Sequence, residues 1–279
     1  MFDFLLPPRS AHLLLTTALL LSLGACTLQP RQSDDERLAA WLPVDVLLLG
    51  EQHDAVAHQR VQQRLVATLA GRGQLAALAL EMADSGTSTA RLPTDASPEQ
   101  VRASLNWDDT AWPWVAYGPA VMAAVRAGVP VLGANLPRSD MRAGMADSQL
   151  DLRLPAPAFK AQQQLIRQGH CDLLPEGQIT PMTRIQIARD RRMADTLVKA
   201  VQPGKVVVLI SGSVHADKQL GVPQHLPAGL QVKSVRLLAG GQVLPGESVD
   251  SVWATEALPD KDHCAGLREQ FGRPAAIKP

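Results

Sequence analysis

The chain has 279 residues, and its 27 Lys and Arg balance its 27 Asp and Glu, which gives a formal net charge of zero. This balance excludes the basic composition typical of nucleic-acid-binding proteins. Apolar residues make up 46%, enough for a full core, whereas aromatic residues make up only 4%, and Tyr117 is the single tyrosine.

Residues 1–25 have the pattern of a signal peptide. The apolar run 13–23 is too short to span a bilayer, which needs roughly 20 apolar residues, and small residues follow it. The tetrapeptide LGAC at 23–26 resembles the lipobox of bacterial lipoproteins, in which the cysteine is acylated and becomes the first residue. An ordinary secretory signal with an incidental cysteine is the alternative. We expect lipidation at Cys26, and Thr27 after it, in place of Asp, indicates an outer-membrane anchor facing the periplasm of a bacterial cell envelope.

About 250 residues follow the signal, enough for one α/β domain with an insertion or for two small domains. The polar stretch 26–40 is expected to be a tether. Beyond it, short apolar runs that suit buried parallel strands alternate with amphipathic helical patterns. The predicted strands are 44–49, 75–80, 129–132, 206–210, 231–238 and 251–254. The predicted helices are 54–70, one starting at 97, 118–127, 158–168 and 180–200.

This alternation predicts an α/β fold with a mainly parallel sheet flanked by helices. Residues 137–180 break the pattern and are rich in Gln, Ala, Arg and Pro. We therefore expect an α/β domain over 41–136 and 181–279, with a smaller helical insertion lobe over 137–180.

Cys171 and Cys264 remain as an even pair if Cys26 is acylated, and a disulfide between them is favoured in an exported protein. It would close a loop of about 94 residues, worth at most roughly 4–5 kcal/mol. Each cysteine follows a histidine, so a zinc site is the alternative, although the usual C-x₂₋₄-C spacing is absent.

Polar side chains follow the predicted strands where each strand ends. The first and fourth strands lead into the same Gly-x-x-His pattern, with Glu51 and His53 after the first and His215 after the fourth, while the second ends in Glu81. Because ligands bind beyond the carboxyl ends of parallel strands, we expect these side chains to meet. They form either a general acid/base cluster or a set of divalent-metal ligands, namely His53, Glu81 and His215.

Other polar residues near these strand ends are weaker candidates. His58 lies one turn into the next helix and by default is a solvated helix histidine. Arg138 follows the third strand. Arg189 lies on the polar face of the long helix, where it can pair with a carboxylate of the site.

The segment 107–119 holds three of the five tryptophans and the only tyrosine. Such density in an aromatic-poor chain indicates either a packed corner, which is favoured, or the wall of a site for a flat apolar ligand.

Several short segments together point to a family. They are LLLGEQHD with His58-Gln59 (47–59), LEM (80–82), WPWVAYGP (112–119), NLPR (135–138), QIARDRRM (186–193), and GSVH with GVPQHL (212–226). In order and spacing they resemble the ChaN family of iron-regulated, haem-binding lipoproteins. The superfamily of that family also includes Tiki metalloproteases, TraB-like proteins and erythromycin esterases.

The resemblance implies a parallel α/β domain with a smaller helical lobe, and haem held at a dimer interface with a tyrosine as axial ligand. Tyr117 takes that role here, since a phenolate suits Fe(III). The cofactor-binding residues that we expect are Tyr117, His53, His58, Arg138, Arg189 and Trp114.

Two functional hypotheses follow. The first is an envelope-anchored lipoprotein that binds haem or an iron complex for uptake or trafficking. Its expected partners are a second copy of the chain, an outer-membrane receptor and the membrane, which it contacts through its lipid. The second, taken from the Tiki and esterase branches, is a hydrolase that depends on a divalent metal such as Mn or Zn and uses Glu51, His53, Glu81 and His215. The sequence favours a binding protein over an enzyme.

Overall fold

The computed structural model describes residues 33–241 and 248–272, and the statements below refer to those residues. The expected signal peptide, Cys26 and the first part of the tether lie outside them. Residues 34–39 of that tether form helix α1 (Asp34–Ala39), which Ser33 caps in a capping box. Leu38 is only 1% exposed, so this end of the tether belongs to the folded domain.

A six-stranded sheet forms the centre of the described chain, with strand order β3-β2-β4-β1-β5-β6. Every neighbouring pair of strands is parallel, which confirms the predicted fold class. The strands are β1 (Val46–Glu51), β2 (Leu75–Asp84), β3 (Val131–Asn135), β4 (Val206–Gly212), β5 (Val232–Ala239) and β6 (Ser251–Thr255).

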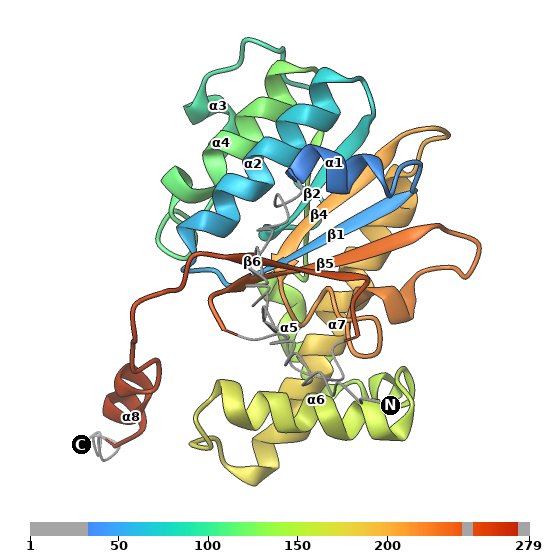
Figure 1. Cartoon of the computed structure of the whole chain (residues 1–279). Coiled ribbons are helices and arrows are strands. Elements are labelled where there is room, and N and C mark those ends of the chain that lie inside the picture. Colours follow the sequence, from blue (N-terminus) through green and yellow to red (C-terminus); the bar gives the residue numbers. More distant parts are fainter. Residues whose placement is uncertain (1–32, 242–247, 273–279) are drawn as a thin grey trace, which may run out of the picture. The chain divides into compact units, whose positions relative to one another are not determined.

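Helices cover both faces of the sheet (Figure 1). On β1, Leu47 and Leu49 join the apolar cluster that holds α2 and α4, whereas Leu48 joins the cluster that holds α7. Alternate side chains of a buried parallel strand therefore serve opposite helical layers. The helices are α1, α2 (Val56–Gly71), α3 (Pro98–Ser104), α4 (Trp114–Arg126), α5 (Met141–Ala146), α6 (Ala156–Gly169), α7 (Glu176–Ala200) and α8 (Ala265–Gly272). Three short 3₁₀ turns accompany them: η1 (Arg138–Asp140), η2 (Ser148–Leu152) and η3 (Val222–His225).

The predicted helical lobe is present. It consists of α5, η2, α6 and the first turns of α7, and it has a small core in which Leu150, Leu154 and Ile187 are buried. The predicted disulfide is also present, with the Cα atoms of Cys171 and Cys264 5.8 Å apart. It joins the turn after α6 to the segment that precedes α8.

The polypeptide after β2 turns back along the outer edge of β3. The amide of Ser85 donates to the Asn135 carbonyl, and the amide of Gly133 donates to the Thr87 carbonyl. The two segments are so close that a Cβ at Gly133 would lie 2.0 Å from the Asp84 carbonyl oxygen, so only glycine fits there.

None of the helices in the described ranges has the length and apolar character needed to cross a bilayer.

Candidate functional site

A cavity of about 660 Å³ opens at the carboxyl edge of the sheet, where the sequence predicted a site. Its volume lies within the usual range for small-molecule sites. The last residues of β2 and β3 and residues that follow β1 and β3 contribute to its walls, together with the loop before α4 and one residue of α7. The lining includes His53, Glu81, Met82, Asp84, Asp108, Trp112, Asn135, Leu136, Arg138, Met141 and Arg189.

Glu51 ends β1, and its carboxylate is the centre of a buried hydrogen-bond network. The Tyr117 hydroxyl donates to Oε1 at 2.6 Å, and Gln62 donates to Oε2 at 2.6 Å. His53 Nδ1 lies 2.9 Å from Oε1. The side chain of Glu51 is 0% exposed, so these three partners replace water around its charge.

His53 joins this network to the cavity. Its side chain is 42% exposed, and its ring meets Trp112 edge-on with 4.8 Å between centroids. Partial burial lowers the pKa of His53, but the hydrogen bond that His53 donates to Glu51 and the negative charge of Glu81 outweigh burial and raise the pKa overall. The imidazole is therefore positioned to gain and release a proton at the cavity wall.

A second buried network surrounds His215. Its Nδ1 lies 2.5 Å from Asp190 and its Nε2 lies 3.3 Å from Glu81. Burial disfavours the imidazolium, but Glu81 and Asp190 raise the pKa of His215 to about 10. Burial raises the pKa of Glu81, but the charge of His215 lowers it to about 2. The ring is thus held as a cation between two acidic side chains.

The pKa of Asp190 itself is raised to about 6, because burial outweighs the attraction of His215. The Nδ1–Oδ1 distance of 2.5 Å is that of a charge-assisted hydrogen bond, and at neutral pH Asp190 is the anionic partner of the imidazolium.

The two networks approach each other at Gly212, the last residue of β4. Its amide donates to Glu81 Oε2 at 2.7 Å. A Cβ at this position would lie 3.1 Å from His53 Nε2 and 3.6 Å from Glu81 Oε2. Glycine therefore lets the outer edge of the His53 ring lie against the end of β4, where a methyl group would be too close.

The metal set predicted from His53, Glu81 and His215 is not assembled. Within residues 33–241 and 248–272, no group of three or more His, Cys, Asp or Glu side chains is arranged to hold a metal ion. The physical reason is that the acidic partners of His215 occupy both of its ring nitrogens.

Tyr117, the expected axial ligand, lies behind the cavity wall. It is 2% exposed, and its ring packs against Trp107 and Trp112, each with 6.0 Å between centroids. Burial and the neighbouring charge of Glu51 raise the pKa of its hydroxyl. Trp107, Trp114 and Tyr117 form the packed corner that the sequence favoured, and Trp112 lines the cavity.

His58 is neither solvated nor part of the cavity, so the interpretation as a solvated helix histidine is wrong. It is 0% exposed, and its Nδ1 accepts a hydrogen bond from the amide of Gln52 at 3.0 Å. Burial lowers its pKa to about 4. His58 is a neutral structural residue that fixes the turn between β1 and α2.

Arg138 and Arg189 both line the cavity, as the sequence suggested. Arg189 Nε is buried, and no described residue accepts a hydrogen bond from it. Asp84, another lining residue, is close enough for its pKa to respond to the charge of Arg189, although the two form no ion pair. One wall of the cavity therefore offers a guanidinium without a carboxylate partner.

Two residues of the networks were not singled out from the sequence, namely Gln62 and Asp190. Asp190 is 0% exposed and belongs to a buried stripe of α7. The stripe has the helical spacing of four and three residues and runs through Thr183, Ile187, Asp190, Ala194 and Leu197. The sequence signal for Asp190 was a carboxylate at a position where the helical spacing of α7 predicts an apolar side chain.

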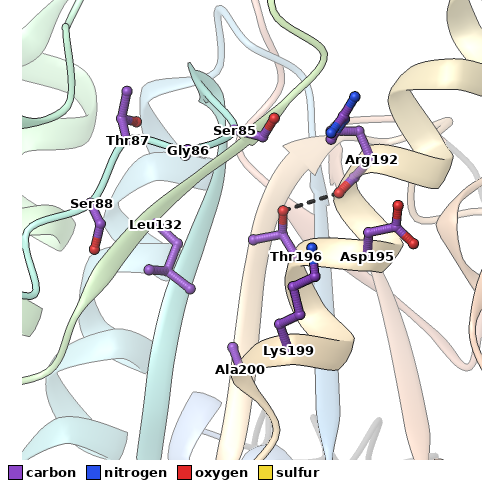
Figure 2. Close-up of a pocket in the computed structure, with 11 residues that line it drawn as sticks. Ser85, Gly86, Thr87, Ser88, Leu132, Arg192, Asp195, Thr196, Lys199 and Ala200 are labelled. Carbon is purple, nitrogen blue, oxygen red and sulfur yellow. Dashed lines mark hydrogen bonds between the residues drawn. The ribbon is translucent and has the colours of Figure 1, made fainter.

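A second hollow, of about 490 Å³, lies between the segment 85–88 and α7 (Figure 2). Arg192, Thr196 and Lys199 face it from the helix, and the hydroxyl of Thr196 donates to the Arg192 carbonyl oxygen at 3.0 Å. Its lining contains no aromatic side chain and none of the site residues predicted from the sequence.

The chain is similar to one protein family and to several solved structures. The sequence profile of a family described as haem-binding uptake, Tiki superfamily, ChaN matches residues 38–226. A solved structure, described as cofacial heme binding to ChaN of Campylobacter jejuni, is similar with a TM-score of 0.64 and 28% identity. That similarity covers 78% of this chain and 90% of the other.

A type III effector, HopBA1, is matched at a TM-score of 0.47 and 18% identity, over 81% of this chain and 94% of the effector. None of the curated proteins matches the chain.

Proposed function

The chain belongs to the ChaN family of haem-binding uptake proteins in the Tiki superfamily, and we propose that it binds haem in the cavity at the carboxyl edge of its sheet. The observation that carries this proposal is the extent of the family match. Residues 38–226 include every residue that lines the cavity, from His53 to Arg189.

The cavity suits the chemistry of haem, which combines a flat apolar ring, a central iron and two propionate carboxylates. Trp112, Leu136 and Met141 give the cavity an apolar and aromatic surface for the ring. Arg189 Nε is buried without an acceptor, which is costly unless a ligand supplies one. A propionate supplies that acceptor, and Arg138 lies in the same lining.

We assign the iron ligand to His53 rather than to Tyr117. Bound haem would supply an iron centre that can take an imidazole nitrogen as a ligand. The His53 side chain is 42% exposed and lines the cavity. Tyr117 is 2% exposed and already donates its proton to Glu51, so its ligation would require the hydroxyl to leave a buried carboxylate.

We further propose that the protein is an envelope lipoprotein, anchored to the outer membrane through Cys26, that takes part in haem uptake or trafficking. The LGAC motif at 23–26 supports the anchor. The Cys171–Cys264 disulfide supports an oxidising compartment. The Campylobacter jejuni protein is described as binding heme cofacially, and by analogy we expect haem to lie between two copies of this chain.

Hemin titration of the purified full-length chain tests the proposal. We expect a Soret band on addition of hemin. His53→Ala should shift and weaken that band, whereas Tyr117→Phe should leave its position unchanged. Arg189→Ala should raise the Kd about tenfold without moving the band, because it removes a contact to the ligand's edge and not to the iron.

Lys199→Ala, in the hollow beside residues 85–88, is the matched control and should titrate as the wild type does. A wild-type chain that gives no Soret band would refute haem binding. A band that moves in Tyr117→Phe but not in His53→Ala would transfer the ligand role to the tyrosine.

A further inference from the structure

The hollow between the segment 85–88 and α7 has no part in the proposed function. Its volume of about 490 Å³ is within the usual range for small-molecule sites. The residues that line it are all different from those that line the cavity at the carboxyl edge of the sheet. They include no aromatic side chain on which a flat ring would stack. A ligand of this hollow is therefore chemically distinct from haem.

One wall of the hollow is held in place by hydrogen bonds on both of its sides. The amide of Ser85 donates to the Asn135 carbonyl oxygen at 2.9 Å, which ties the segment 85–88 to the end of β3. On the other side, the Ser104 hydroxyl donates to the Ser88 carbonyl oxygen at 2.6 Å. The wall is therefore formed before any ligand arrives, which lowers the cost of binding.

The hollow is rich in hydrogen-bond donors. Arg192 and Lys199 lie seven residues apart on α7, which places them on the same face of the helix, toward the hollow (Figure 2). Arg192 is 41% exposed, and one of its nitrogens lies 3.3 Å from Asp140, which leaves its other N–H groups for a ligand. Within residues 33–241 and 248–272, neither the Lys199 ammonium nor the Ser85 hydroxyl has an ion-pair or hydrogen-bond partner.

Negative charge is sparse in the same lining. Asp195 is the one carboxylate among the lining residues, and in Figure 2 it points away from the segment 85–88. The hydroxyl of Thr196 already donates its proton to the Arg192 carbonyl oxygen, so it offers a ligand only an acceptor. Two cations and a free hydroxyl donor thus surround space that an anionic group fits.

We propose that this hollow binds the phosphate group of a small polyol phosphate ester. A phosphate monoester carries a charge of about −1.5 to −2 at pH 7 and three strong acceptor oxygens. This charge matches the two cations, and three oxygens match donors on both walls, namely Arg192, Lys199 and Ser85. A carboxylate has only two oxygens, and a single guanidinium satisfies both. The Thr196 oxygen and the Ser88 hydroxyl are left to bind the hydroxyl groups of the ester.

Calorimetric titration of the purified full-length chain with glycerol 3-phosphate tests the proposal. We expect binding that Arg192→Ala and Lys199→Ala each weaken by about tenfold, because each removes a charged donor. Lys199→Arg keeps the charge and should retain most of the affinity. Lys160→Ala, which removes an exposed lysine of α6 outside the hollow, is the matched control and should bind as the wild type does.

Two further probes define the ligand. Glycerate carries a carboxylate in place of the phosphate and should bind more weakly than glycerol 3-phosphate; equal affinity would overturn the assignment to phosphate. Sedimentation with phosphatidylcholine vesicles that contain phosphatidic acid distinguishes the source of the ester. A soluble ligand gives calorimetric binding without vesicle binding, whereas vesicle binding that Arg192→Ala and Lys199→Ala abolish assigns the same site to a lipid headgroup.

The proposal fails independently of haem binding. A wild-type chain that binds neither glycerol 3-phosphate nor these vesicles overturns the phosphate site, and so does binding that Arg192→Ala and Lys199→Ala leave unchanged. Because the hollow and the cavity have separate linings, hemin-loaded and hemin-free chains should bind glycerol 3-phosphate equally well. Competition between hemin and glycerol 3-phosphate would overturn the placement of the phosphate in the hollow.

Discussion

Gly212 shows how one missing side-chain atom shapes the candidate site. It ends β4 opposite Glu51 in the β1–β4 register, so its Cα faces the space between the two histidine networks. A Cβ there would fill that space at 3.1 Å from His53 Nε2. The residue type at this position therefore controls how closely the His53 ring can approach the end of β4.

Gly212→Ala should accordingly weaken hemin binding by about tenfold, or 1.4 kcal/mol, because the methyl group displaces His53 or blocks its Nε2. Spectroscopic titration measures the effect. Gly177→Ala, in the exposed first turn of α7, has no atom within 4 Å of the new Cβ and is the matched control. Equal affinities for the two variants would argue that Nε2 does not face the ligand.

At the scale of elements, the apolar runs predicted the sheet because each strand is buried on both faces. Helix boundaries were predicted less well. α4 begins at Trp114 and α7 at Glu176, so Pro119 and Pro181 lie inside these helices, although proline usually starts or interrupts a helix. Periodicity also does not identify long-range partners, so it did not predict the contact between Asp190 of α7 and His215, which follows β4.

The place of Asp190 in α7 carries a stability prediction. Asp190→Ala leaves the buried His215 cation with one acidic partner, and removing one member of a buried ion pair typically costs about 3–5 kcal/mol. Denaturant unfolding should show a loss of this size. Asp195→Ala, an exposed residue of the same helix, should change the free energy of unfolding by less than about 0.5 kcal/mol. A loss below 1 kcal/mol in Asp190→Ala would mean that His215 is neutral in the folded chain.

The same pair makes stability depend on pH. The pKa of His215 is raised from 6.5 to about 10, so its contribution is complete below pH 6.5 and is lost as the pH rises through 10. In Asp190→Asn the folded pKa should fall toward 6.5. Between pH 7 and pH 10, the free energy of unfolding should therefore decline less in this variant than in the wild type. Parallel declines in the two proteins would contradict the assignment.

At the scale of the whole molecule, the Cys171–Cys264 disulfide ties the helical lobe to the segment before α8. Its loop of about 94 residues gives at most roughly 4–5 kcal/mol in the chain-entropy model. Replacing both cysteines with serine should lower the free energy of unfolding by up to that amount. Hemin affinity should stay unchanged, because neither cysteine lines the cavity.

Reductant provides the internal control for this prediction. It should destabilise the wild type to the level of the double variant and leave the double variant unaffected. A double variant that unfolds at the wild-type denaturant concentration would show that the cross-link restricts the unfolded chain very little.

The segment that returns along β3 affects how copies of the protein can associate. An uncovered edge strand exposes backbone donors and acceptors. These groups can pair with a strand of another chain, which leads to aggregation. Here the residues after β2 already pair with that edge through the amides of Ser85, Gly133 and Thr89. Two copies of the chain are therefore prevented from pairing backbone to backbone along β3, so any contact between copies on that side of the sheet is made by side chains.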